Sequence, residues 1–138
     1  MARLVLEQGP MRTTERTELT RPLLAAQGAY FLTTGIWPLV HMQSFEAVTG
    51  PKTDKWLVKT VGLCIASIGG ALLCAAARDR VTPEIRNLAI TSALSLAGID
   101  IWYSLTGRIS KVYLADAVPE LALAAGLTAP LSDKLSAE

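Results

Sequence analysis

Residues 56–77 read WLVKTVGLCIASIGGALLCAAA, and Lys59 is the only charged residue among them. From Val61 to Ala77 no position carries a charge, so a helix over these residues has no polar stripe on any face. A helix at the surface of a soluble bundle needs such a stripe, whereas crossing a hydrocarbon layer of ~30 Å takes about 20 apolar residues. The stretch therefore predicts a membrane-spanning helix, with Lys59 close enough to one end to reach the interface.

Three more apolar blocks flank this one, and two of them have clear helix start signals. Thr20 and Pro22 suit the start of the first block, because a hydroxyl caps free N–H groups and proline fits a first turn. Thr82 and Pro83 suit the start of the third block for the same reason. The fourth block is the weakest span, because it contains charged residues and a proline.

The sequence thus predicts an all-α fold, an integral membrane bundle of four transmembrane helices. The expected helices cover about 22–41, 54–77, 83–106 and 110–129. We expect a polar N-terminal segment over 1–21, the four-helix membrane domain over 22–130 and a polar tail over 131–138.

Basic residues predict the orientation. Eight of the 13 Lys and Arg residues lie in the two tails or around the second connector: Arg3, Arg12, Arg16, Arg21, Arg78, Arg80, Arg86 and Lys134. The other five lie around the first and third connectors: Lys52, Lys55, Lys59, Arg108 and Lys111. Because Lys and Arg favour the cytoplasmic side, we expect both termini in the cytoplasm and a multi-pass protein of a bacterial inner (plasma) membrane.

Composition narrows the function classes. The chain has 138 residues, a net charge of +1 and 18% charged residues, below the quarter typical of soluble domains. No basic run predicts nucleic-acid binding. Cys64 and Cys74 are too far apart on one helix to form a disulfide, and we expect both to be small buried hydrophobes. No phosphate loop, zinc motif or serine elbow is present, so no cofactor or metal is predicted, and whether the protein is an enzyme stays open.

Acids inside the apolar blocks are the best pointers to a site. An ionised Asp at a helix centre costs about 2.5–3.5 kcal/mol on insertion scales, so it is paired, protonated or facing a wet cavity. Side-chain spacing places Tyr113, Asp116 and Glu120 on one face of the fourth helix. No basic residue of that helix lies three or four positions from Glu120.

The other expected site residues lie near the side of the membrane opposite the cytoplasm, which we call the outer side. Asp100 and Tyr103 share one face of the third helix, and Trp37 and His41 lie at the end of the first. The predicted ligand-binding set is therefore Trp37, His41, Asp100, Tyr103, Tyr113, Asp116 and Glu120, in a cavity of the outer half.

Each of these residues also has a structural interpretation. Asp116 with Lys111, or Asp100 with Arg108, could form a structural ion pair. His41 could be an interfacial residue, and the tryptophans could be belt anchors at the membrane surface.

Small residues predict where helices pack closely. Ala66-xxx-Gly70 and Ala89-xxx-Ala93-xxx-Ala97 are small-xxx-small patterns, which allow close approach of two backbones. They indicate contacts inside one bundle or, alternatively, a dimer face.

Two stretches carry a resemblance to small bacterial membrane proteins. They are TGIWPLVHMQSFEAVTGPKTDKW from Thr34 and GRISKVYLADAVPE from Gly107. In topology the chain resembles DoxX-like four-helix proteins, and its plan is similar to the larger sterol-isomerase-like membrane domains. The resemblance implies a four-helix bundle with a cavity for an apolar ligand. No catalytic motif matches residue by residue, so no catalytic role is carried over.

The leading hypothesis is a small inner-membrane protein that binds an apolar or amphipathic ligand, such as a lipid, quinone or isoprenoid. Glu120 or Asp116 could then move protons in an isomerase-like reaction. One alternative is a structural accessory subunit of a larger membrane complex. Another is a proton-coupled transporter acting as an oligomer. The expected partners are membrane lipids, an apolar small molecule and further copies or other membrane subunits, with no nucleic acid.

Overall fold

The computed structural model describes the backbone of residues 2–135 and the side chains of residues 19–128. Over this range the fold is all-α, with no strand. The five helices are α1 (Ala2–Val40), α2 (Met42–Thr49), α3 (Lys55–Ala77), α4 (Pro83–Leu105) and α5 (Val112–Leu135). The predicted all-α class is confirmed.

The bounds of α3 and α4 agree with the predicted 54–77 and 83–106. At the start of α4 the Thr82 hydroxyl accepts a hydrogen bond from the Ile85 backbone N–H at 3.3 Å, as its cap position predicts. α1 instead begins at Ala2 and continues through Pro22, so Pro22 does not start this helix. α5 likewise continues beyond residue 130 into the predicted polar tail, of which residues 136–138 lie outside the described part.

The connector at 41–55 contains a helix that the sequence did not predict. His41 precedes α2, and its Nδ1 accepts a hydrogen bond from the Ser44 backbone N–H at 3.1 Å. α2 ends at Thr49, and the C-cap residue Gly50 has a φ of 95°, a conformation that glycine adopts without strain.

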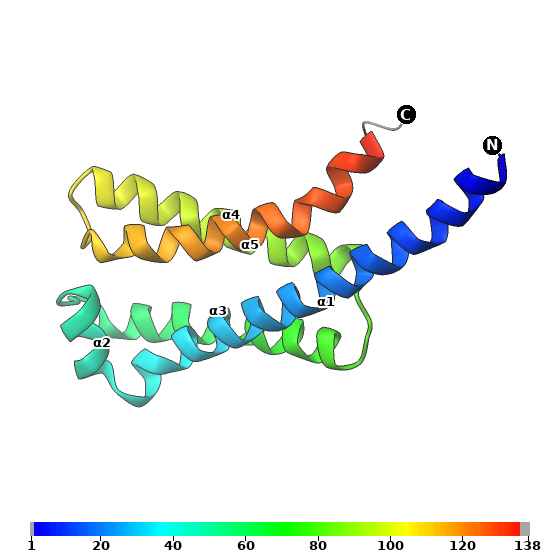
Figure 1. The fold of residues 1–138 in the computed structure, drawn as a ribbon. Helices are drawn as coiled ribbons and strands as arrows, with labels where there is room; N and C mark the ends of the chain where they lie inside the picture. The colour runs from blue at the N-terminus through cyan, green and yellow to red at the C-terminus, as the bar shows by residue number, and fades with distance from the viewer. Residues whose placement is uncertain (1, 136–138) are drawn as a thin grey trace.

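The four long helices form two antiparallel hairpins (Figure 1). α1 packs mainly on α3, and α4 packs mainly on α5, while contacts between the hairpins are sparse. Both termini lie at one end of the bundle, which we call the termini end. α2 and the turn at 106–111 lie at the opposite end, the α2 end (Figure 1).

Glycines bring the backbones of α1 and α3 into direct contact. A Cβ at Gly69 would lie 2.7 Å from the Gly28 carbonyl oxygen, and one at Gly62 would lie 2.5 Å from that of Gly35. The two glycines of each helix are two turns apart, so both pairs lie along one seam. Ala66 is buried between them on α3. Such close contact is how small residues hold membrane helices together.

The small-residue patterns predicted from sequence are only partly correct. Ala89, Ala93 and Ala97 are buried within the single chain, which supports contacts inside one bundle. Ala66 also faces a neighbouring helix, but a Cβ added at Gly70 would meet nothing within 4 Å. Gly69, and not the predicted Gly70, is the glycine that packs against α1 beside Ala66.

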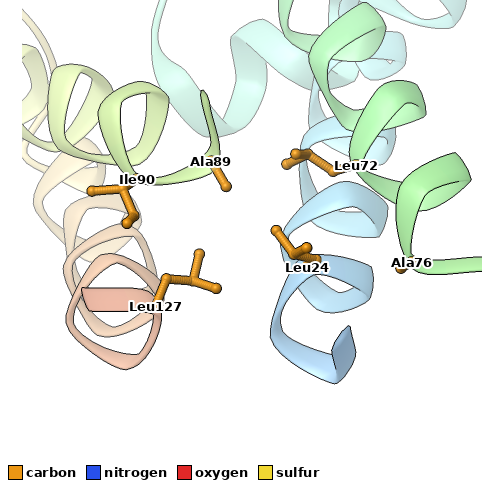
Figure 2. Packing of buried hydrophobic residues seen from close by; sticks show 6 residues of the cluster. All are labelled: Leu24, Leu72, Ala76, Ala89, Ile90 and Leu127. Carbon is orange, nitrogen blue, oxygen red and sulfur yellow. The ribbon is translucent and has the colours of Figure 1, made fainter. Parts of the chain in front are cut away.

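An apolar cluster joins the two hairpins near the termini end (Figure 2). Its members come from all four long helices and are Leu24, Leu72, Ala76, Ala89, Ile90 and Leu127. Nearby, the buried Gln27 side chain donates a hydrogen bond from Nε2 to the Ala89 carbonyl at 2.8 Å, which ties α1 to α4. The two hairpins are therefore in direct contact at this end.

Three helical segments are long and apolar enough to cross a membrane: Leu19–Val40, Lys55–Ala77 and Pro83–Leu105. Within the described residues α5 is not among them. Large apolar side chains are exposed on the bundle, among them Leu63 and Leu94 at 55% and 48%. Cys64 and Cys74 are also exposed, so the expectation that they are buried is wrong. An apolar outer surface is what a hydrocarbon environment requires.

The α1–α3 seam can be tested with adjacent glycines. Gly69→Ala should lower the free energy of unfolding by about 1–3 kcal/mol, because the added methyl group overpacks two backbones. Gly70→Ala should not lower it and should raise it by up to about 1 kcal/mol, since that position faces open space and alanine is the better helix former. Denaturant unfolding of the purified protein in mild detergent measures both, and equal effects would contradict the seam.

Candidate functional site

A cavity of about 470 Å³ lies between the two hairpins at the α2 end. Most of its lining is apolar and comes from α1, α3 and α4. Its polar lining residues are Thr34, Lys52, Tyr113, Asp116 and Glu120. Three of the seven predicted site residues therefore meet on one cavity, as their shared face on α5 predicts.

A second cavity of about 340 Å³ adjoins the first. The two cavities share Thr34, Phe45, Tyr113 and Asp116. Trp37 lines this second cavity only. We call the four shared residues, which lie where the two cavities meet, the waist. Glu120 lines only the larger cavity, and Trp37 lines only the second one.

Glu120 is the most deeply buried acid, with 1% of its surface exposed, and its Oε2 has no hydrogen-bond partner. Asp100 is 6% exposed, and its Oδ2 also has no partner. Asp116 lies one turn before Glu120 on the same face of α5 and lines the same cavity. A buried carboxylate in this position is costly unless a cation or hydrogen-bond donor reaches it.

No basic side chain of residues 19–128 forms an ion pair with these acids. Among the side chains of residues 19–128, the one ion pair joins Lys55 to Glu46 in the connector. The alternative structural pairs, Lys111 with Asp116 and Arg108 with Asp100, are therefore wrong for this chain. The acids remain available to a ligand.

Two prolines add polar backbone to the same region. Pro38 and Pro119 lie inside α1 and α5 and have no N–H to donate. The carbonyls four residues earlier, of Thr34 and Ala115, therefore lack the usual helical bond from these positions. Both of those residues line the second cavity. Unbonded backbone at membrane depth occurs where it lines a cavity or is buried in protein.

Lys52 lines the larger cavity from the connector, where its ammonium group lies against aromatic rings. Its Nζ is 5.0 Å from the centroid of Tyr113 and 5.9 Å from that of Phe45. The same Nζ donates a hydrogen bond to the Thr49 carbonyl at 3.2 Å. This is the geometry of a cation–π contact.

Glu46 fixes the connector that carries Lys52. The Lys52 backbone N–H donates to Glu46 Oε1 at 2.9 Å, and the Lys55 ammonium lies 3.4 Å from Oε2. The backbone hydrogen bond is the main reason that the pKa of Glu46 is lowered, and Lys55 adds to the effect. The position of Lys52 thus depends on a carboxylate in α2.

Trp37 positions α2 over the second cavity. Its Nε1 donates to Ser44 Oγ at 2.8 Å, and its ring meets that of Phe45 edge-on with centroids 5.6 Å apart. These contacts join the end of α1 to α2, so that Phe45 reaches both cavities.

Three of the predicted site residues do not line these two cavities. His41 is exposed and caps α2, which is a structural role. Tyr103 is 38% exposed, because α4 buries Asp100 and Ser104 and turns residue 103 outwards. Asp100 is buried inside the bundle, where its Oδ2 has no hydrogen-bond partner.

The larger cavity opens sideways between α3 and α4. Leu57, Val61 and Ile99 line it and are also exposed by 47%, 47% and 53%. α3 and α4 have few contacts with each other, so no packed seam closes the gap between these rims. An apolar rim on the outer surface faces the hydrocarbon when the bundle spans a membrane.

The site residues missed by sequence reasoning are Thr34, Phe45 and Lys52. Thr34 is polar within an apolar block, which is a weak signal. Phe45 and Lys52 come from the connector, and only the fold of α2 brings them to the cavity.

Comparisons of the chain with family models, curated proteins and solved structures find no match. The likeness to DoxX-like proteins stays a prediction from the sequence.

The connector geometry can be tested at Glu46 by NMR titration. Its pKa should lie below that of a free glutamate, and Lys55→Gln should leave most of the shift, because the backbone hydrogen bond is the main cause. Since the folded-state pKa is lowered, the contact stabilises the connector above the ordinary pKa and is lost as the pH falls through the lowered one. Lys59→Gln is the control. An ordinary pKa in Lys55→Gln would make the ion pair, not the backbone bond, responsible.

Proposed function

We propose that the chain is a bacterial inner-membrane protein with four transmembrane helices that binds an apolar or amphipathic ligand at the α2 end. The ligand class is that of lipids, quinones and isoprenoids. Glu120, Asp116 and Tyr113 form the polar part of the site, with Trp37 beside them across the waist.

The proposal of a fourth transmembrane helix is supported by the two faces of α5, one buried in the bundle and one exposed. The helix runs antiparallel to α4 and covers Val112–Leu135, which is long enough to cross ~30 Å of hydrocarbon. It buries Ala117 and Glu120 inside the bundle and exposes Val118 and Leu121 on the outside by 66% and 44%. Asp116 and Glu120 therefore lower the apolarity of the sequence, but both line the cavity between the helices.

The buried, unpartnered carboxyl of Glu120 on the larger cavity carries the ligand proposal. The cavity volume falls within the ~300–1,000 Å³ of small-molecule sites, which are mostly apolar with a few polar groups. The apolar lateral rim gives a hydrophobic molecule a route from the bilayer. The bound ligand supplies the partner that Glu120 Oε2 lacks within the described residues.

Co-extraction tests this function. Mass spectrometry of the protein purified in mild detergent should find one enriched lipid, quinone or isoprenoid, and the Asp116→Asn/Glu120→Gln variant should lose it. The exposed Glu84→Gln is the control for loss of one acid elsewhere. Bulk phospholipid alone in all three samples, with another protein attached, would instead identify an accessory subunit.

Cysteine labelling in intact cells tests the orientation. After Cys64 and Cys74 are replaced by alanine, an impermeant maleimide should label Arg108→Cys in the α2-end turn. Arg80→Cys, in the connector at the termini end, should react only after lysis. This pattern follows from termini in the cytoplasm, and the reverse pattern would place the α2 end there.

A further inference from the structure

The acidic and basic side chains around the larger cavity are unequal in number. Asp116 and Glu120 line it, Asp100 is buried in the neighbouring helix α4, and Lys52 is the one basic lining residue. The Lys52 ammonium is held on aromatic faces and on the Thr49 carbonyl, and forms no ion pair with the acids. The deep part of the cavity therefore has more acid than the chain itself compensates.

Ligands of different charge would interact differently with these acidic side chains. An anion would be repelled by the acids at short range, where the low dielectric of the interior strengthens the repulsion. A neutral molecule can accept a hydrogen bond from a protonated carboxyl but leaves the excess acid without a counter-ion. A cation supplies the counter-charge that a buried carboxylate requires.

Lys52 shows that the aromatic part of the lining accepts a cation. Its Nζ lies over Tyr113 at 5.0 Å, and Tyr113 lines both cavities. The face of an aromatic ring attracts ammonium groups, and aromatic lining is a common feature of sites for organic cations. A ligand cation near Tyr113 would also be on the face of α5 that carries Glu120.

We propose that the ligand of this cavity is a hydrophobic cation, an apolar body with an amine or quaternary ammonium group, for which Glu120 is the counter-ion. The proposal rests on the proposed function and narrows its ligand class. The body lies against the apolar lining of α3 and α4, and the charged group lies between Glu120, Asp116 and Tyr113. The molecule enters between α3 and α4 from the hydrocarbon.

The test compares three probes of similar build and different charge on the full-length protein in phosphatidylcholine nanodiscs. They are tetraphenylphosphonium, tetraphenylborate and neutral triphenylphosphine oxide. Equilibrium dialysis against empty nanodiscs removes the contribution of partition into lipid. We expect tetraphenylphosphonium to bind at least tenfold more tightly than either other probe.

Variants then assign the counter-ion. Glu120→Gln should weaken tetraphenylphosphonium binding at least tenfold, while Glu120→Asp, which keeps the charge, and Glu84→Gln should weaken it much less. Lys52→Gln should strengthen binding severalfold, because it removes a like charge from the lining. The Lys52 variant and the comparison of probes decide the matter even if Glu120→Gln fails to fold.

The outcomes separate this proposal from the one it rests on. Equal binding of the neutral probe and the cation, with no effect of Glu120→Gln, would overturn the cation proposal and leave an apolar-ligand site. Tighter binding of the anion would also overturn it. Binding of none of the three probes, together with only bulk phospholipid in the co-extract, would overturn both.

Discussion

The close approach of α1 and α3 at their paired glycines is the contact on which the rest of the bundle depends. The backbones meet at Gly28 with Gly69 and at Gly35 with Gly62, so none of these four positions has room for a side chain. The second hairpin packs differently, through alanines on α4 and α5. The two hairpins then meet in an apolar cluster near the termini end, and the space between them at the α2 end holds the cavities.

The separation of the packed helix contacts from the cavities explains how the bundle tolerates buried acids. A membrane helix bundle gains little from burying apolar side chains, since lipid is as apolar as its core, so close packing must hold it together. The packed seam and the cluster supply that contact away from Glu120, whose Oε2 has no partner. The acid therefore lies where its cost is offset by packing elsewhere, as at functional sites in general.

Much of the fold was predictable because its signals are local. An uncharged apolar run located α3, and a cap with an apolar run located α4, while the spacing on α5 brought Tyr113, Asp116 and Glu120 together. The rotation of α4 about its axis was not predictable, because packing on α5 sets it and turns Tyr103 outwards.

Other features depend on which segments meet in space. Phe45 and Lys52 reach the cavity only because α2 folds back on Trp37. The glycine seam was missed for the same reason: each helix shows two glycines seven residues apart, and nothing local says which helix faces them.

Under the function proposed above, the side entrance sets what the cavity can select. Leu57, Val61 and Ile99 form an apolar rim, so the molecules that reach it from a bilayer would be apolar ones, whose concentration partition raises there. Apolarity alone would then also admit bulk lipid, so in this proposal the discrimination comes from the buried carboxyls. A ligand that offers them a partner would gain more from the cavity than from the bilayer.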